Sequence, residues 1–250
     1  MTSQKGEVSL YNKGDIDYSD LYKNNWIDND DYFYENNHSD ILFVTFAGMG
    51  WKKSLPTFIF YNFLKSYTNI DKLFLRDVKG RYYLTGLKNT SNNYEDTLDF
   101  YKTLISKKKY KRVVGIGCSA GGFAAILYGL QLNFDKIIAF SPQTVLNNKK
   151  DTLIKDIYNA PKTCVWLRNL NKNNINYQKA LDLKNFGPFT SKIDIHYSLK
   201  GNKGIDKKHA EYLSDDPNCV IFEHPGNDHM VALALRNNGQ LKKIIDTAIW

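Results

Sequence analysis

A glycine-rich turn between an apolar run and a small-residue helical stretch is the feature that most constrains this chain. The segment Gly117-Cys118-Ser119-Ala120-Gly121-Gly122 follows Val113-Val114-Gly115-Ile116 and precedes Phe123-Ala124-Ala125-Ile126. A strand, a Gly-x-Ser-x-Gly turn and a helix, in that order, are typical of a nucleophile elbow. Gly117 and Gly121 suit so sharp a bend because glycine permits close approach and unusual backbone angles. We therefore predict that Ser119 projects from the carboxyl edge of a sheet.

The three cysteines point to a reducing compartment. Cys118 lies beside the serine, but an elbow exposes only its central position, so we expect Cys118 to be packed. With Cys164 and Cys219 it forms an odd set without metal-ligand spacing, so we expect free thiols and no metal site. Met1 to Tyr11 lacks an apolar signal region, and no stretch is long enough to span a bilayer. We predict a cytoplasmic protein.

Apolar runs alternate with helical patterns along most of the chain. This alternation predicts a mostly parallel sheet with helices on both faces, in one domain over residues 1–250. Residues 1–40 are polar and aromatic, and we expect short antiparallel edge strands there. Residues 145–190 interrupt the pattern and are predicted to form a small helical cap. The expected strands are Ile41–Phe46, Lys72–Leu75, Val113–Ile116, Lys136–Phe140, Ile193–Leu199 and Cys219–Phe222, and the expected helices include Pro56–Tyr67, Tyr94–Ile105, Lys207–Leu213 and Gly239–Trp250.

A serine hydroxyl needs a base, which histidine supplies when a carboxylate orients it. On a sheet of this kind the three groups follow one another along the chain as serine, acid and histidine. His229 lies after the last predicted strand, in a loop that leads to a helix, and is the predicted base. His224, which ends that strand, is the main alternative. His38, His196 and His209 fit less well, since they lie before the sheet, within a strand and within a helix.

Asp206 is the predicted acid, because it follows the strand Ile193–Leu199 in a loop that contains two glycines. It would equally serve to cap the helix that follows, a common role for aspartate. Asp228 is the alternative acid, although neighbouring loop side chains such as those of Asp228 and His229 usually diverge. Both assignments stay open at this point.

Acyl transfer creates an oxyanion, which preorganised amide donors stabilise. The amide of Ala120 begins the predicted helix and is the first candidate. Gly48 and Met49 follow the strand Ile41–Phe46 and offer the second, unless the loop is a simple turn.

Charged and aromatic residues after another strand are candidates for substrate binding. Arg76, Tyr82 and Tyr83 lie there, and they would equally form an ion pair and packed rings. The net charge of +8 is typical of a solvated, lysine-rich surface, and its functional alternative is attraction of an anionic partner such as a phosphorylated acyl donor or an acidic glycan. No nucleic-acid motif accompanies the charge, so we do not expect a nucleic-acid partner.

Together these residues resemble the α/β-hydrolase superfamily from Ile41 onward. More narrowly, the chain is similar to small proteins of that fold from bacterial capsule and surface-polysaccharide gene sets, including capsular-polysaccharide O-acetyltransferases. The segments that carry the narrower resemblance are Thr45-Phe46-Ala47-Gly48, Arg76-Asp77 with Tyr82-Tyr83, Ser141-Pro142-Gln143, and the spacing Asp206-x-x-His209.

This resemblance implies O-acetyl chemistry on a surface glycan. We expect a serine-dependent enzyme that transfers or hydrolyses an ester of a carbohydrate through an acyl-enzyme. We expect no bound cofactor, with acetyl-CoA as a candidate acyl donor. A lipid or thioester hydrolase and a non-catalytic glycan-binding protein on the same fold are the alternatives.

Overall fold

The computed structural model describes residues 31–49, 58–154 and 162–250. Its seven strands form one sheet in the order β1-β3-β2-β4-β5-β6-β7. β1 pairs antiparallel with β3, and every other neighbouring pair is parallel. The strands are β1 (Tyr32–Glu35), β2 (Ile41–Phe46), β3 (Asp71–Leu75), β4 (Arg112–Cys118), β5 (Lys136–Phe140), β6 (Lys192–Ser198) and β7 (Cys219–His224).

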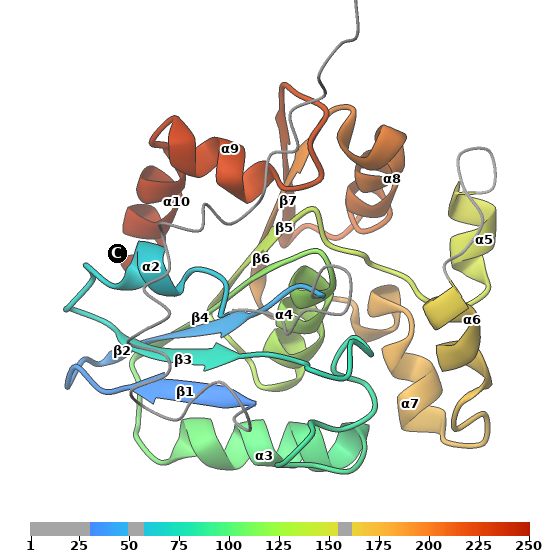
Figure 1. Cartoon of the computed structure of the whole chain (residues 1–250), viewed down its shortest axis with the longest axis horizontal. Helices are drawn as coiled ribbons and strands as arrows, with labels where there is room; N and C mark the ends of the chain where they lie inside the picture. Colours follow the sequence, from blue (N-terminus) through green and yellow to red (C-terminus); the bar gives the residue numbers. More distant parts are fainter. Residues whose placement is uncertain (1–30, 50–57, 155–161) are drawn as a thin grey trace, which may run out of the picture.

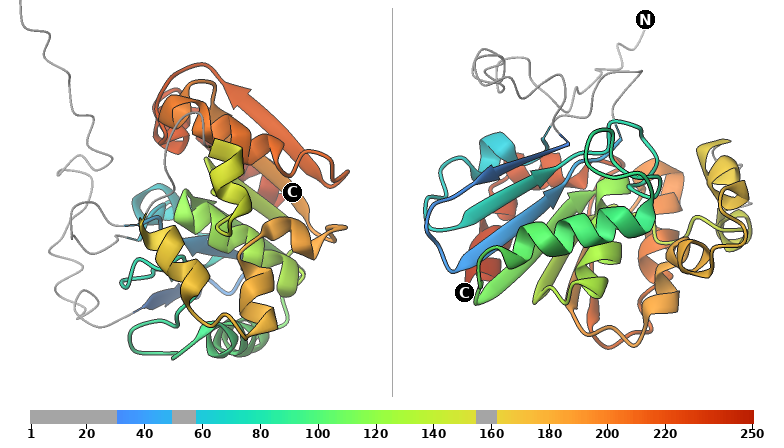
Figure 2. Two further views of the ribbon diagram at one scale, coloured as in Figure 1. Left: turned by 90° about the vertical axis from the view of Figure 1, so that its right-hand side faces the viewer. Right: turned by 90° about the horizontal axis from the view of Figure 1, so that it is seen from below.

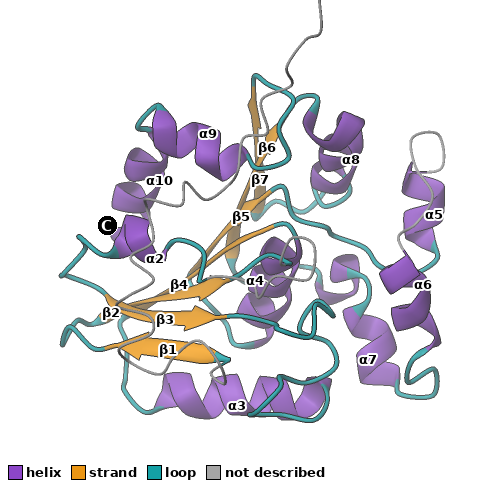
Figure 3. Ribbon diagram, viewed as in Figure 1, coloured by secondary structure: helices purple, strands orange, loops and turns teal. Residues whose placement is uncertain are grey.

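Helices cover both faces of the sheet (Figures 1 and 3). On one face, the side chains of α3, α4 and α8 join the core cluster that contains Tyr101 and Phe123. On the other, those of α2, α9 and α10 pack around Phe43 and Phe74. This arrangement confirms the predicted mostly parallel α/β fold. The helices on the two faces are α2 (Tyr61–Leu64), α3 (Tyr94–Ser106), α4 (Ala120–Gln131), α8 (Ile205–Glu211), α9 (Val231–Asn237) and α10 (Gln240–Ile249).

Most predicted boundaries lie within two residues of the observed ones. β5 has the predicted bounds, whereas β7 continues two residues beyond Phe222 to His224. The predicted helix Pro56–Tyr67 is observed only as the single turn α2, and Pro56 lies outside the described residues. Of the predicted edge strands in residues 1–40, β1 is observed, and residues 1–30 are not described. No helix in the described part of the chain is both long and apolar enough to cross a membrane.

A group of short helices lies beyond the end of the sheet toward which β2 and β3 point (Figures 1 and 2). They fall within residues 145–190, where a cap is predicted, and residues 155–161 among them are not described. Arg81 stacks over the ring of Trp166 at 4.4 Å and so links this group to the loop after β3. That the segment acts as a cap stays a prediction. The short helices are α5 (Lys149–Ile154), α6 (Lys162–Asn169), α7 (Ile175–Ala180) and the 3₁₀ turn η1 (Leu183–Phe186).

The amino end of α4 touches the backbone at the ends of β2 and β4. A Cβ atom on Gly121 would lie 2.1 Å from the carbonyl oxygen of Phe46 in β2. One on Gly117 would lie 2.2 Å from the carbonyl oxygen of Gly121. Side chains never approach backbone so closely, so only glycine allows this packing. The two glycines therefore fix where α4 begins relative to the sheet.

We predict that Gly121→Ala destabilises the fold by about 3 kcal/mol, because its new Cβ atom meets rigid backbone. Gly80→Ala is the matched control: Gly80 has a φ of +62° but no atom within 4 Å of an added Cβ. Its cost is that of backbone strain alone, about 1 kcal/mol. Urea denaturation of both variants measures the difference, and equal costs would show that close packing at Gly121 is unimportant.

Candidate active site

Ser119 occupies the bend between β4 and α4 with φ 54° and ψ −118°. A positive φ is uncommon for a residue with a side chain and is maintained only where the surroundings enforce it. Here the amide of Ser119 donates to the carbonyl of Phe140 at 2.9 Å, and its carbonyl accepts from the amide of Phe123 at 3.0 Å. Ser119 is half-buried, whereas Cys118 and Ala120 on either side are buried. The bend therefore exposes the serine and packs its neighbours, including the Cys118 thiol.

Asp206 and His229 meet although 23 residues separate them along the chain. The imidazole Nδ1 lies 2.9 Å from each carboxylate oxygen of Asp206. The side chain of Asp206 is 2% exposed and that of His229 is 27% exposed. A carboxylate that accepts from Nδ1–H leaves Nε2 as the basic nitrogen, facing away from the acid. The pair therefore has the geometry of an oriented general base.

Helix α8 and a close glycine position the acid. Asp206 lies in the first turn of α8, and the residue that caps this helix is Gly204 in a left-handed conformation. The capping role considered for Asp206 is therefore wrong. A Cβ atom on Gly201 would lie 2.5 Å from Oδ2 of Asp206, so glycine at this position leaves room for the carboxylate.

Asp228 makes a different contact. Its side chain is exposed, and its Oδ1 accepts from the amide of Met230 at 2.9 Å, in a turn that leads into α9. The structure thus brings Asp206, and not Asp228, to the imidazole.

Ser119 and His229 both follow parallel strands, β4 and β7, and so lie toward the same edge of the sheet. Among the described residues, no hydrogen bond joins the Ser119 hydroxyl to the imidazole of His229. Such bonds are often long in proteins without substrate and tighten when it binds. The contact between the two side chains stays a prediction.

The loop after β2 lies against the elbow. A Cβ atom on Gly48 would lie 3.2 Å from the carbonyl oxygen of Cys118 and 4.0 Å from Cβ of Ser119. Met49 follows and is 45% exposed. Ala120, the third predicted oxyanion residue, is the first residue of α4, where amides lack an acceptor within the helix. The backbone amides of Gly48, Met49 and Ala120 thus belong to segments that adjoin Ser119.

Two other histidines pair with each other. Nδ1 of His196 lies 3.0 Å from Nε2 of His224, and the ring of His196 stacks between Phe140 and Phe222. Burial, then the neighbouring His224 and Lys136, lowers the pKa of His196 to about 3. Burial also lowers the pKa of His224. His224, the alternative base, therefore has an imidazole partner where His229 has a carboxylate.

His209 is buried within α8. Its Nδ1 lies 3.1 Å from the amide nitrogen and 3.0 Å from the hydroxyl of Thr144. Burial, with smaller effects of Lys150 and His229, holds the pKa of His209 well below its usual value. His38 is exposed in the turn after β1. Among the carboxylates that the structure describes, that of Asp206 alone contacts a histidine, His229.

The predicted substrate-binding residues after β3 are buried. The guanidinium of Arg76 lies over the ring of Phe58 at 4.6 Å. The hydroxyl of Tyr82 donates to Oε1 of Gln143 at 3.1 Å, and that of Tyr83 bonds to backbone. Contact of these side chains with a substrate stays a prediction.

The burial of Lys150 was not predicted, because a lysine in an Asn- and Lys-rich segment is typically exposed. It is 1% exposed in α5, and its ammonium donates to Oε1 of Gln143. Burial lowers its pKa. No local pattern distinguishes this lysine from its neighbour Lys149, which is largely exposed.

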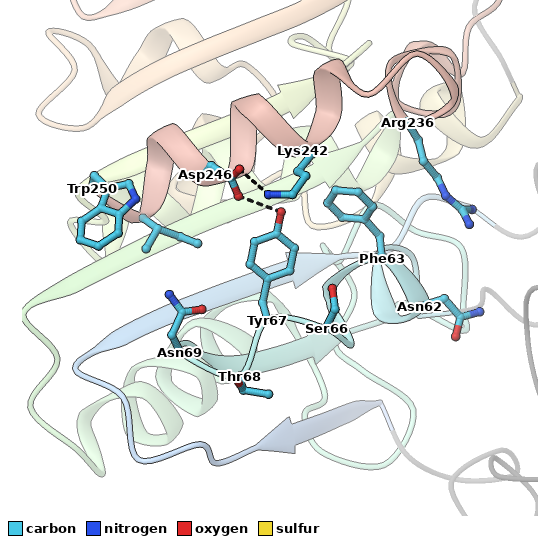
Figure 4. Close-up of a pocket in the computed structure, with 11 residues that line it drawn as sticks. Asn62, Phe63, Ser66, Tyr67, Thr68, Asn69, Arg236, Lys242, Asp246 and Trp250 are labelled. Atoms are coloured by element: carbon cyan, nitrogen blue, oxygen red, sulfur yellow. Dashed lines mark hydrogen bonds and ion pairs between the residues drawn. The ribbon is translucent and has the colours of Figure 1, made fainter.

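A cavity of about 600 Å³ lies between α2 and α10 (Figure 4). Within it, the hydroxyl of Tyr67 and the ammonium of Lys242 both donate to Asp246, at 3.0 and 2.6 Å. It contains none of the candidate catalytic residues. Among the described residues, no group of three or more His, Cys, Asp or Glu side chains is arranged to hold a metal ion.

Comparison with solved structures identifies the architecture. A capsule O-acetyltransferase of Neisseria meningitidis serogroup A superposes with a TM-score of 0.63 at 20% identity, over 86% of this chain and 90% of that one. The chain has the α/β-hydrolase fold. The fluorophosphonate-binding serine hydrolase FphF of Staphylococcus aureus matches with a TM-score of 0.55 at 14% identity, over 84% of each chain.

An esterase from Thermogutta terrifontis with butyrate bound matches with a TM-score of 0.56 at 13% identity, over 87% of this chain and 88% of that one. No described protein family and no curated protein sequence matches this chain. At these identities the structural likeness establishes the fold, and the chemistry has to be argued from the residues.

The lowered pKa of His196 makes the stability of the fold depend on pH. Since the pKa of His196 is about 3 in the fold and 6.5 ordinarily, between these values the unfolded chain binds more protons. Stability therefore falls as the pH is lowered from 6.5, by up to about 1.4 kcal/mol per pH unit for this group. We predict a shallower dependence for His196→Phe, which retains the ring stack.

Urea denaturation at pH 7 and pH 5 measures this dependence. His38→Asn, at an exposed position, should leave the wild-type difference unchanged. An identical pH dependence for His196→Phe and wild type would contradict the role of His196.

Proposed function

We propose that this protein is a serine-dependent acyl-transfer enzyme with Ser119 as nucleophile, His229 as base and Asp206 as the orienting acid. The observation that carries the proposal is the presence of two independent features at one edge of the sheet. One is a half-buried serine in an enforced backbone conformation, and the other is a buried carboxylate bonded to a partly exposed imidazole. Neither feature is needed to stabilise an α/β sheet, and acyl transfer requires both.

In the proposed reaction, Nε2 of His229 takes the proton of the Ser119 hydroxyl as its oxygen attacks an ester or thioester carbonyl. Asp206 stabilises the imidazolium and keeps the ring oriented. The amides of Ala120 and of Gly48 or Met49 donate to the oxyanion. The imidazolium then protonates the leaving group, and the acyl group stays on Ser119 until water or a sugar hydroxyl accepts it.

The compound on which we propose that the enzyme acts is an O-acetyl ester of a bacterial surface polysaccharide. Transfer would form this ester, and hydrolysis would cleave it. The fold of a capsule O-acetyltransferase and the net charge of +8 support this choice. A positively charged protein attracts an anionic glycan and a phosphorylated donor such as acetyl-CoA. Hydrolysis and transfer use the same three side chains and differ in whether the pocket excludes water and binds an acceptor.

The experiment that tests the proposal is covalent labelling with a fluorophosphonate, followed by incubation with acetyl-CoA and candidate bacterial glycans. We expect labelling of the wild type and none of Ser119→Ala. Cys118→Ala should be labelled like wild type, because the Cys118 side chain is buried.

With acetyl-CoA, release of CoA together with a glycan mass gain of one acetyl group indicates transfer. Loss of acetyl from a pre-acetylated glycan indicates hydrolysis. A folded wild-type protein that is not labelled would overturn the catalytic proposal in favour of a glycan-binding role, and labelling with turnover of lipid esters alone would favour a lipid hydrolase.

We predict that Asp206→Asn lowers kcat roughly 10,000-fold, because an amide neither holds the productive tautomer of His229 nor stabilises its charge. The matched control is Asp228→Asn, whose side-chain oxygen still accepts from the amide of Met230. It should retain activity within about twofold of wild type, as surface substitutions do. Steady-state hydrolysis of p-nitrophenyl acetate provides the measurement. The opposite ranking of the two variants would identify Asp228 as the acid.

A further inference from the structure

Tyr83 carries a hydroxyl that is buried at the carboxyl ends of two strands. The residue is 1% exposed. Its hydroxyl lies 2.9 Å from the carbonyl oxygen of Ala47 and 3.2 Å from that of Leu75. Ala47 follows β2 and Leu75 ends β3, so a single side chain bonds to the backbone where both strands end.

The backbone of Tyr83 is itself fixed. Its φ is +62°, and that of Tyr82 before it is +58°. Two successive side-chain residues in this region are costly and need external support. Oδ2 of Asp77 accepts from the amide of Tyr83 at 2.9 Å, and the hydroxyl of Tyr128 donates to its carbonyl at 2.6 Å. Asp77 and Tyr128 are both buried. These two bonds hold the backbone of Tyr83 and thereby fix the direction in which its side chain extends.

The bond from Tyr83 reaches the peptide that begins the loop beside Ser119. The carbonyl of Ala47 and the amide of Gly48 belong to one planar group and point in opposite directions. A donor on that carbonyl therefore also sets where the Gly48 amide points and how the chain continues to Met49. The amino end of α4 also limits this peptide, since a Cβ atom on Gly121 would lie 2.7 Å from both the carbonyl carbon and the carbonyl oxygen of Ala47.

We propose that Tyr83 is a positioning residue, whose hydroxyl holds the Ala47–Gly48 peptide so that the loop presents an amide to the oxyanion formed at Ser119. This inference rests on the proposed acyl-transfer function and adds to it the residue that orders the second oxyanion donor. Tyr83 acts through the backbone and does not touch the reacting atoms.

The hydroxyl of Tyr83 keeps its proton, which the role requires. Burial, with the charge of Asp77 as a smaller cause, raises the pKa of Tyr83 well above its usual value. The phenol therefore donates to the Ala47 carbonyl throughout the pH range in which the enzyme would work.

The test is Tyr83→Phe, which removes one hydroxyl and retains the ring. Removal of an oxyanion donor costs roughly 100- to 1,000-fold in kcat, and a displaced donor costs less. We expect kcat for p-nitrophenyl acetate to fall about 10- to 100-fold with KM unchanged within about twofold. The inhibition constant of a trifluoromethyl ketone, which forms a charged tetrahedral adduct on serine, should rise by a similar factor.

Tyr101→Phe is the matched control. The Tyr101 hydroxyl is buried in the same aromatic cluster and has no hydrogen-bond partner among the described residues. Its removal should leave kcat and the inhibition constant unchanged. If Tyr83→Phe does not fold, Tyr128→Phe, which removes the bond to the Tyr83 carbonyl, should lower kcat in the same direction with KM retained.

The outcomes separate this inference from the function on which it rests. A folded Tyr83→Phe with wild-type kcat and inhibition constant overturns the role of Tyr83, while Ser119-dependent labelling of the wild type leaves the enzyme assignment intact. Equal losses of kcat in Tyr83→Phe and Tyr101→Phe would also overturn it, since they would indicate a general effect of core packing. Wild-type protein that a fluorophosphonate does not label at Ser119 overturns the function itself.

Discussion

The contact between the amino end of α4 and the ends of β2 and β4 is the constraint on which the rest of this structure depends. Glycine at positions 117 and 121 removes the side chains that would separate helix from sheet. As a result, Ser119 is held at a positive φ just before α4. Within the turn 117–122 it is the only half-buried residue, and the others are buried. The same contact presses the loop after β2 against the elbow. The close packing of α4 on these two strands thus positions both the serine and the backbone amides near it.

Burial gives the same residue type different properties at different places. His196 and His209 are buried, and no carboxylate in the described part of the chain bonds to them, so the fold disfavours their charged forms. His229 is partly exposed and bonds to Asp206, the arrangement from which the proposed base role is argued. Asp206, in turn, is a buried acid whose described hydrogen bonds both go to this imidazole. A buried carboxylate is costly without such a partner, so the pair is a joint product of the fold.

Two buried tyrosines form hydrogen bonds to the backbone around the proposed site. The hydroxyls of Tyr83 and Tyr128 satisfy backbone carbonyls at the ends of strands and in the loop after β3, where the regular pairing of the sheet stops. Buried backbone groups must be bonded, and at strand ends side chains supply the missing partners. A large ring with a polar tip does this while still filling the core. Tyr83 and Tyr128 therefore both fill the core and hold the loop backbone that they bond.

The amino-acid sequence by itself determined the strands, the elbow and the serine, since these follow from short-range patterns: apolar runs, glycine spacing and alternation with helices. It also predicted His229, in the loop after the last strand, as the base and left His224 as the main alternative. It left Asp206 and Asp228 as alternative acids, marked Tyr83 only as a candidate for substrate binding, and gave Lys150 no distinguishing mark. Only the tertiary structure decided which carboxylate meets His229, because that depends on the room that Gly201 leaves and on the burial of α8. Burial and contacts between distant segments arise only when the whole chain packs, so no local pattern encodes them.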